Sequence, residues 1–134
     1  YFTKVMDVKN TEDINYAIVD GGIHQLNYYG QIMGMKRPHL TLVNADGTVN
    51  EEEQNLPWNI CGSLCTVNDV ILKGAMFPML SKGDCIIFEN CGAYSVTEGM
   101  VLFLSRELPQ ILFYSEKDGF TVAREMKETN LINS

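Results

Sequence analysis

A cysteine and a tyrosine stand in the two segments of this sequence that are best suited to chemistry. Cys65 lies three residues after Gly62 and is followed by small polar residues, a composition typical of a loop and not of a buried strand. A thiol in such a loop can act as a general acid, because cysteine titrates within reach of neutral pH. The residues alone fit an ordinary loop cysteine equally well.

Tyr94 belongs to the second segment, in which an apolar run ending at Phe88 is broken by Gly92. A tyrosine just beyond such a break can direct its hydroxyl, which donates and accepts hydrogen bonds, at the phosphate of a ligand. A strand, a bend and a half-buried tyrosine would show the same residues. Composition alone favours this simpler interpretation.

Other common site patterns are absent from the sequence. It contains no phosphate-binding glycine loop, and no GxGxxG, HExxH or GxSxG pattern. Its histidines, His24 and His39, do not favour a Ser-His-Asp or Cys-His arrangement. The spacings of the cysteines differ from the two-residue knuckles of zinc sites, so we expect no metal. The cysteines are Cys61, Cys65, Cys85 and Cys91.

Short segments rich in β-branched and aromatic residues must position these side chains. Turn residues such as Asp-Gly pairs separate them, a pattern typical of strands and hairpins. We expect strands over residues 2–8, 15–19, 40–43, 85–88, 110–114 and 120–124. Short strands punctuated by turns predict a mainly β fold, a sandwich or barrel-like β-domain.

Helical signals are weak, and we expect only one or two short helices. Asn68 and Asp69 could cap one of them over residues 68–73. The stretch 44–57 contains a run of glutamates and is typical of a solvated loop, whereas residues 22–35 fit no period cleanly.

Length and composition indicate one globular domain over residues 1–134. The 134 residues are 46% hydrophobic and carry a formal net charge of −7. This acidic balance disfavours a sequence-independent nucleic-acid binder, and no apolar run could span a bilayer. Tyr1 opens what resembles the middle of a strand. We therefore expect a truncated piece of a longer, cytoplasmic protein, which would have lost any targeting segment.

Three ordered motifs resemble the fold-type III pyridoxal-phosphate-dependent decarboxylases, the ornithine, diaminopimelate and arginine decarboxylase family. Residues 83–96 resemble the family's GD…GAY motif, with Tyr94 as its tyrosine. Residues 58–69 resemble its GPxC-[DE]-x-x-D motif, with Cys65 as its cysteine. Residues 19–30 resemble its DxG…LYG segment. The matches cover nearly the whole chain.

The resemblance implies that this chain is the C-terminal β-domain of a two-domain enzyme. A barrel domain would hold pyridoxal 5'-phosphate on a lysine, and the β-domain would complete the active site at the interface of a homodimer. Cys65 would be the acid that reprotonates the decarboxylated carbanion. Tyr94 would bind the cofactor phosphate and, in some members, the substrate, while Tyr29 would lie near the substrate's distal end. Without the barrel domain, the fragment is expected to be inactive.

Three departures from the family concern the distal end of the amino-acid substrate. The family places aspartate or glutamate directly after the cysteine to hold a distal ammonium group, whereas this chain has Thr66 at that substrate-contact position. Gly30 follows Tyr29 in place of the aspartate of ornithine decarboxylases. Residues 25–27 offer no counterpart of the arginine of diaminopimelate decarboxylases. The substrate's identity is therefore open.

Two alternative functions are open at this point. A fold-type III racemase would share the fold, although the GAY and cysteine segments favour a decarboxylase. A stand-alone, non-catalytic β-barrel ligand-binding module would require the three ordered matches to be a coincidence. Neither nucleic acid nor membrane is an expected partner.

Overall fold

The computed structural model describes residues 1–27, 39–51, 53–54 and 56–134. The chain divides into two compact units, Tyr1–Gly99 and Met100–Ser134, and each contains one sheet. The expected single domain over residues 1–134 stays a prediction.

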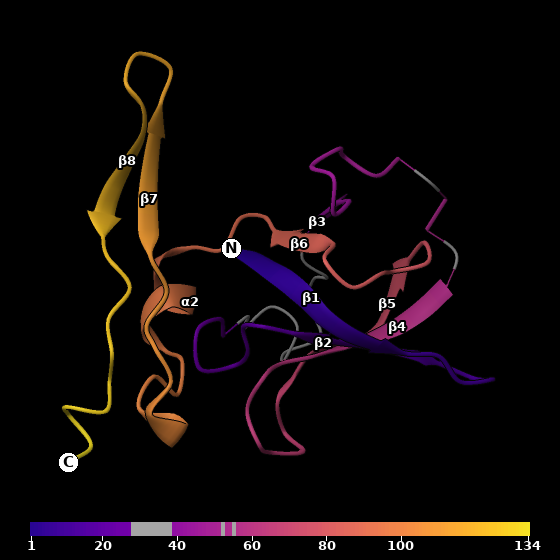
Figure 1. Cartoon of the computed structure of the whole chain (residues 1–134), viewed down its shortest axis with the longest axis horizontal. Coiled ribbons are helices and arrows are strands. Elements are labelled where there is room, and N and C mark those ends of the chain that lie inside the picture. Colours follow the sequence, from indigo (N-terminus) through magenta and orange to yellow (C-terminus); the bar gives the residue numbers. More distant parts are fainter. Residues whose placement is uncertain (28–38, 52, 55) are drawn as a thin grey trace. The chain divides into compact units, whose positions relative to one another are not determined.

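The first unit is built on one six-stranded sheet that curls into a half-barrel, which confirms the mainly β fold (Figure 1). Its spatial order is β3-β6-β1-β2-β4-β5. Strands β2 and β4 run parallel, and the other neighbouring pairs run antiparallel. The strands are β1 (Phe2–Lys9), β2 (Asn15–Val19), β3 (Leu40–Val43), β4 (Leu56–Cys61), β5 (Val70–Phe77) and β6 (Cys85–Phe88).

These strand directions place the ends of several strands at the same end of the sheet. Strand β1 begins where its antiparallel neighbours β2 and β6 finish, since Phe2 pairs with Ile87 and Val5 with Val19. Strand β4 is parallel to β2, so it finishes at the same end, with Cys61 opposite Ile18. The segments that follow β2, β4 and β6 therefore leave the sheet from the same end.

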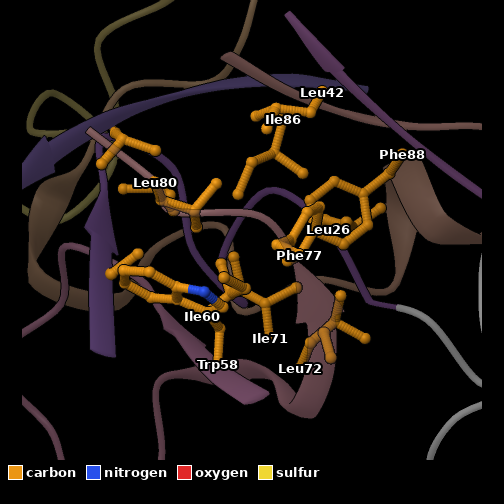
Figure 2. Close-up of a cluster of buried hydrophobic side chains, with 14 residues drawn as sticks. Leu26, Leu42, Trp58, Ile60, Ile71, Leu72, Phe77, Leu80, Ile86 and Phe88 are labelled. Atoms are coloured by element: carbon orange, nitrogen blue, oxygen red, sulfur yellow. The ribbon is translucent and has the colours of Figure 1, made fainter. Parts of the chain in front are cut away.

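Buried apolar side chains from both halves of the sheet form the core (Figure 2). Trp58, Phe77 and Phe88 are almost completely buried. The indole nitrogen of Trp58 donates a hydrogen bond to the carbonyl oxygen of Pro78 at 3.1 Å, so this large side chain is buried without losing its polar contact. Leu26, from the segment after β2, belongs to the same cluster.

Three of the expected strands, β2, β3 and β6, have the predicted bounds, whereas two strands were not predicted. The expected helix over residues 68–73 is wrong, because residues from Val70 onward form β5 and pair with β4. The expected loop over residues 44–57 is wrong at its end, because β4 begins at Leu56. Strand β4 pairs with the distant β2 and with β5, and β5 pairs with β4, so both are defined by pairing that their own local sequence does not reveal.

The helices among the described residues are short, as expected. The helix α2 (Ala93–Thr97) spans five residues, and a single 3-10 turn, η1 (Phe103–Ser105), opens the second unit. That unit also contains an antiparallel hairpin of β7 (Ile111–Ser115) and β8 (Gly119–Arg124). Within the described part of the chain, no helix is long and apolar enough to cross a membrane.

Candidate functional site

Residues 62–69, hereafter the cysteine loop, connect β4 to β5 and close on themselves. The Gly62 N–H donates to the carbonyl oxygen of Asp69 at 2.9 Å, and the Asp69 N–H donates to the carbonyl oxygen of Thr66 at 3.2 Å. The Leu64 N–H donates to Oδ2 of Asp69 at 2.7 Å. Leu64 is buried, and its neighbour Cys65 is exposed. The loop thus anchors its leucine and presents its thiol to solvent.

The cysteine loop is fastened to residues 20–27, hereafter the 20–27 turn, which follow β2. The Ser63 N–H donates to the carbonyl oxygen of Gly21 at 2.7 Å, and the Ser63 hydroxyl donates to the carbonyl oxygen of Asp20 at 3.0 Å. The Ile23 N–H donates to Oδ1 of Asp69 at 2.9 Å. Two neighbouring parallel strands therefore continue into segments that hold each other.

The same turn also contacts the segment that carries Tyr94. The Asn27 N–H donates to the carbonyl oxygen of Ser95 in α2 at 3.4 Å. The Asn27 side-chain amide donates to the carbonyl oxygen of Glu98 at 3.5 Å. A Cβ atom on Gly99 would lie only 2.5 Å from the carbonyl oxygen of His24, so the two backbones approach closely. The 20–27 turn thus joins the three motifs found in the sequence.

Tyr1, which precedes β1, and Thr3, which lies in β1, also hold the 20–27 turn. The Tyr1 hydroxyl donates to Oε1 of Gln25 at 2.6 Å, and burial raises the pKa of this hydroxyl, which keeps it a donor. The Thr3 hydroxyl donates to Oδ1 of Asp20 at 2.7 Å and accepts the Gly21 N–H at 3.1 Å. The 20–27 turn is therefore held by hydrogen bonds from β1 as well as from the cysteine loop.

Gly22 and Gly62, which both lie in motifs, leave room for the carboxylate of Asp69 because neither has a side chain. A Cβ atom would lie 2.2 Å from Oδ2 of Asp69 if built on Gly62, and 2.7 Å from the same oxygen if built on Gly22. Sequence reasoning matched Gly62 and Asp69 to a motif but missed this role. Glycines in two of the motifs, Gly22 and Gly62, were the available signal.

Gly62→Ala is expected to lower the free energy of unfolding by about 1–3 kcal/mol, because the added methyl group would push into the Asp69 carboxylate. Urea unfolding of the 134-residue chain measures this change. Gly92→Ala is the control, since a Cβ at Gly92 would meet no atom within 4 Å and its φ is −71°. The control should change stability by about 0.5 kcal/mol or less. Equal stability for both variants would contradict the proposed crowding.

The structure separates Cys65 from the other cysteines. All four thiols are free, and Cys65 is exposed while Cys61, Cys85 and Cys91 are half-buried. Burial raises the pKa of each of those three half-buried thiols. Among the thiols, Cys65 is therefore the most accessible to a ligand or reagent.

The other predicted site residues have different surroundings. Tyr94 lies in α2 and is 75% exposed, so its side chain is accessible to a ligand. Thr66 is half-buried, and its hydroxyl oxygen accepts the Asn68 N–H at 3.3 Å. Tyr29 lies outside the described residues. The catalytic, cofactor and substrate roles predicted for Cys65, Tyr94, Thr66 and Tyr29 stay predictions.

A family described as the C-terminal sheet domain of pyridoxal-dependent decarboxylases matches residues 1–92. These residues include the 20–27 turn, the cysteine loop and the GD end of the third motif. The match ends at Gly92, just before α2.

Several known proteins are similar to the chain. A 2-[(L-alanin-3-ylcarbamoyl)methyl]-2-hydroxybutanedioate decarboxylase of Staphylococcus aureus is 27% identical, over 87% of this chain and 30% of that protein. An L-glutamyl-[BtrI acyl-carrier protein] decarboxylase of Niallia circulans is 30% identical, over 81% of this chain and 26% of that protein. The chain thus spans less than a third of these relatives.

Solved structures show the same fold. A crystal structure of diaminopimelate decarboxylase superposes with a TM-score of 0.82 at 21% identity, covering 98% of this chain and 32% of that chain. A diaminopimelate decarboxylase from Helicobacter pylori, complexed with L-lysine, gives a TM-score of 0.75 at 23% identity, covering 98% of this chain and 30% of that chain.

Proposed function

Because this chain belongs to the C-terminal sheet domain family of pyridoxal-dependent decarboxylases, we propose that it is the β-domain of a cytoplasmic amino-acid decarboxylase. In this proposal it completes an active site at the interface of a homodimer. The observation that carries the proposal is the exposed thiol of Cys65, on a closed loop that shares its supporting turn with the Tyr94 helix. The decarboxylases named above, of which the chain spans less than a third, support it.

The donors of this chain fit an accessory role toward pyridoxal phosphate. The hydroxyl of the exposed Tyr94 can donate to a phosphate oxygen, and the exposed thiol of Cys65 can supply a proton. When bound, the cofactor supplies the electron sink that makes loss of carbon dioxide feasible. The lysine that anchors it would come from a barrel domain outside these residues.

Each site residue has one task in the proposal. Cys65 holds a proton at Sγ and transfers it to the substrate carbon that has lost its carboxylate. Tyr94 holds the cofactor phosphate, and its place on α2 leaves the hydroxyl free to do so. Tyr29 and Thr66 contact the distal end of an amino-acid substrate. Thr66 carries no charge, so its contact would be a hydrogen bond and not an ion pair.

Decarboxylation is favoured over racemisation because the similar proteins named above are decarboxylases. Incubation of the natural gene product with pyridoxal phosphate and candidate amino acids tests this choice. Release of carbon dioxide with formation of an amine supports it. Inversion of the substrate's α-carbon without carbon dioxide release would instead show that the protein is a racemase.

The 134-residue chain by itself is expected to release no carbon dioxide from any amino acid. The physical reason is that it would lack the lysine and the barrel that hold the cofactor over the substrate. The assay compares the purified chain plus pyridoxal phosphate with pyridoxal phosphate alone, using diaminopimelate, ornithine, lysine and arginine. Carbon dioxide release above the cofactor-only rate would contradict the need for a second domain.

A further inference from the structure

The carboxylate of Asp69 is almost fully buried and joins two separate segments. The residue is 3% exposed. Its Oδ1 accepts the Ile23 N–H at 2.9 Å, and its Oδ2 accepts the Leu64 N–H at 2.7 Å. A buried carboxylate with a backbone donor on each oxygen makes charge-assisted bonds, which are stronger and more directional than neutral ones. Asp69 therefore fixes the cysteine loop against the 20–27 turn.

Asp69 forms hydrogen bonds with the residues directly before and directly after Cys65. Leu64, directly before Cys65, donates its N–H to the Asp69 carboxylate. Thr66, directly after Cys65, accepts the Asp69 N–H on its carbonyl oxygen at 3.2 Å. The buried Leu64 side chain adds an apolar anchor on the same side of the cysteine. The backbone on both sides of Cys65 is thus fixed by one residue, while the thiol is exposed.

We propose that Asp69 is the positioning residue that orients the Cys65 thiol for proton transfer, an inference that rests on the proposed function of Cys65. Both oxygens of Asp69 accept backbone N–H groups, from Ile23 and from Leu64, so its proposed role runs through the backbone. It acts by holding the peptide units on either side of the thiol. Proton transfer depends steeply on donor placement, so loosening these units should slow it without changing how the substrate binds.

Asp84, the aspartate of the GD pair in the turn that precedes β6, provides a matched control. It is 6% exposed, and its Oδ1 and Oδ2 accept the N–H groups of Ala45 and Ser81 at 3.1 and 2.7 Å. Burial, charge and donor number therefore match those of Asp69. Neither of its donors belongs to the cysteine loop. Asp84→Asn should destabilise the fold much as Asp69→Asn does, but it should leave the backbone beside Cys65 in place.

The test is a double-mutant cycle on the natural gene product, saturated with pyridoxal phosphate and followed by single-turnover carbon dioxide release and by steady-state kinetics. Asp69→Asn should lower kcat by about tenfold to a hundredfold with KM nearly unchanged. In a Cys65→Ala background the same change should alter the residual rate by no more than about twofold. Asp84→Asn should change kcat by no more than about twofold in either background.

Independent effects of Asp69→Asn and Cys65→Ala, which multiply, would overturn the proposal, and so would an equal loss of kcat in Asp84→Asn. A second readout needs no catalysis: the rate at which iodoacetamide alkylates Cys65. Asp69→Asn should change this rate by more than about twofold, and Asp84→Asn should not. If the natural protein releases no carbon dioxide, the proposed function fails. The alkylation rates then still decide whether Asp69 positions the thiol.

Discussion

Replacing Cys65 by alanine is expected to lower the kcat of the natural enzyme by about a hundredfold to ten-thousandfold, the usual cost of losing a general acid. Cofactor binding should be intact, because Cys65 lies in a loop whose hydrogen bonds are made by other residues. Carbon dioxide release measures kcat, and the visible absorbance of the enzyme-bound cofactor measures its occupancy. Products should also be analysed, since an unprotonated substrate carbon would be diverted to other products.

Cys85→Ala is the control for this prediction. Cys85 is half-buried in β6, and burial raises the pKa of its thiol, so we expect it to contribute to packing alone. Its replacement should lower stability without a comparable loss of kcat. At neutral pH, iodoacetamide should also alkylate Cys65 before the half-buried thiols. A Cys65→Ala enzyme with a normal rate and normal products would show that this cysteine is only a loop residue.

Tyr94→Phe is expected to weaken binding of pyridoxal phosphate to the natural enzyme by about tenfold to a hundredfold. The change removes one hydrogen bond to a charged phosphate, which is worth about 1.5–3 kcal/mol. Little folding energy should be lost, because Tyr94 is 75% exposed. Titration of the cofactor-free enzyme with pyridoxal phosphate, followed by absorbance, gives the dissociation constant.

Tyr114→Phe is the matched control for Tyr94→Phe. Tyr114 is 66% exposed and lies in β7, where its ring packs against Phe120 with a centroid distance of 5.0 Å. It loses the same hydroxyl group, yet it belongs to no motif, so cofactor affinity should be unchanged. Equal cofactor affinities for the wild type and Tyr94→Phe would show that the Tyr94 hydroxyl does not bind the cofactor phosphate.

The sequence by itself determined the family and several of the strands. The apolar runs of β2, β3 and β6 are bounded by turn residues, so their local pattern was sufficient to predict them. The motif spacing singled out the cysteine loop and the Tyr94 segment, and the family match over residues 1–92 confirms the resemblance. Exposure of Cys65 also agrees with its predicted place in a loop.

Only the tertiary structure decided what Asp69 and its neighbouring strands do. Asn68-Asp69 followed by Val70 is locally typical of a capped helix, but the Asp69 side chain accepts N–H groups from Ile23 and Leu64 and caps nothing downstream. Residues 70–77 then form a strand because β4 supplies their backbone partners. Strand β4 lies only one loop earlier in the chain, but the local pattern of residues 70–77 does not encode this pairing. Two parallel strands that end together, β2 and β4, bring the 20–27 turn and the cysteine loop within hydrogen-bonding distance.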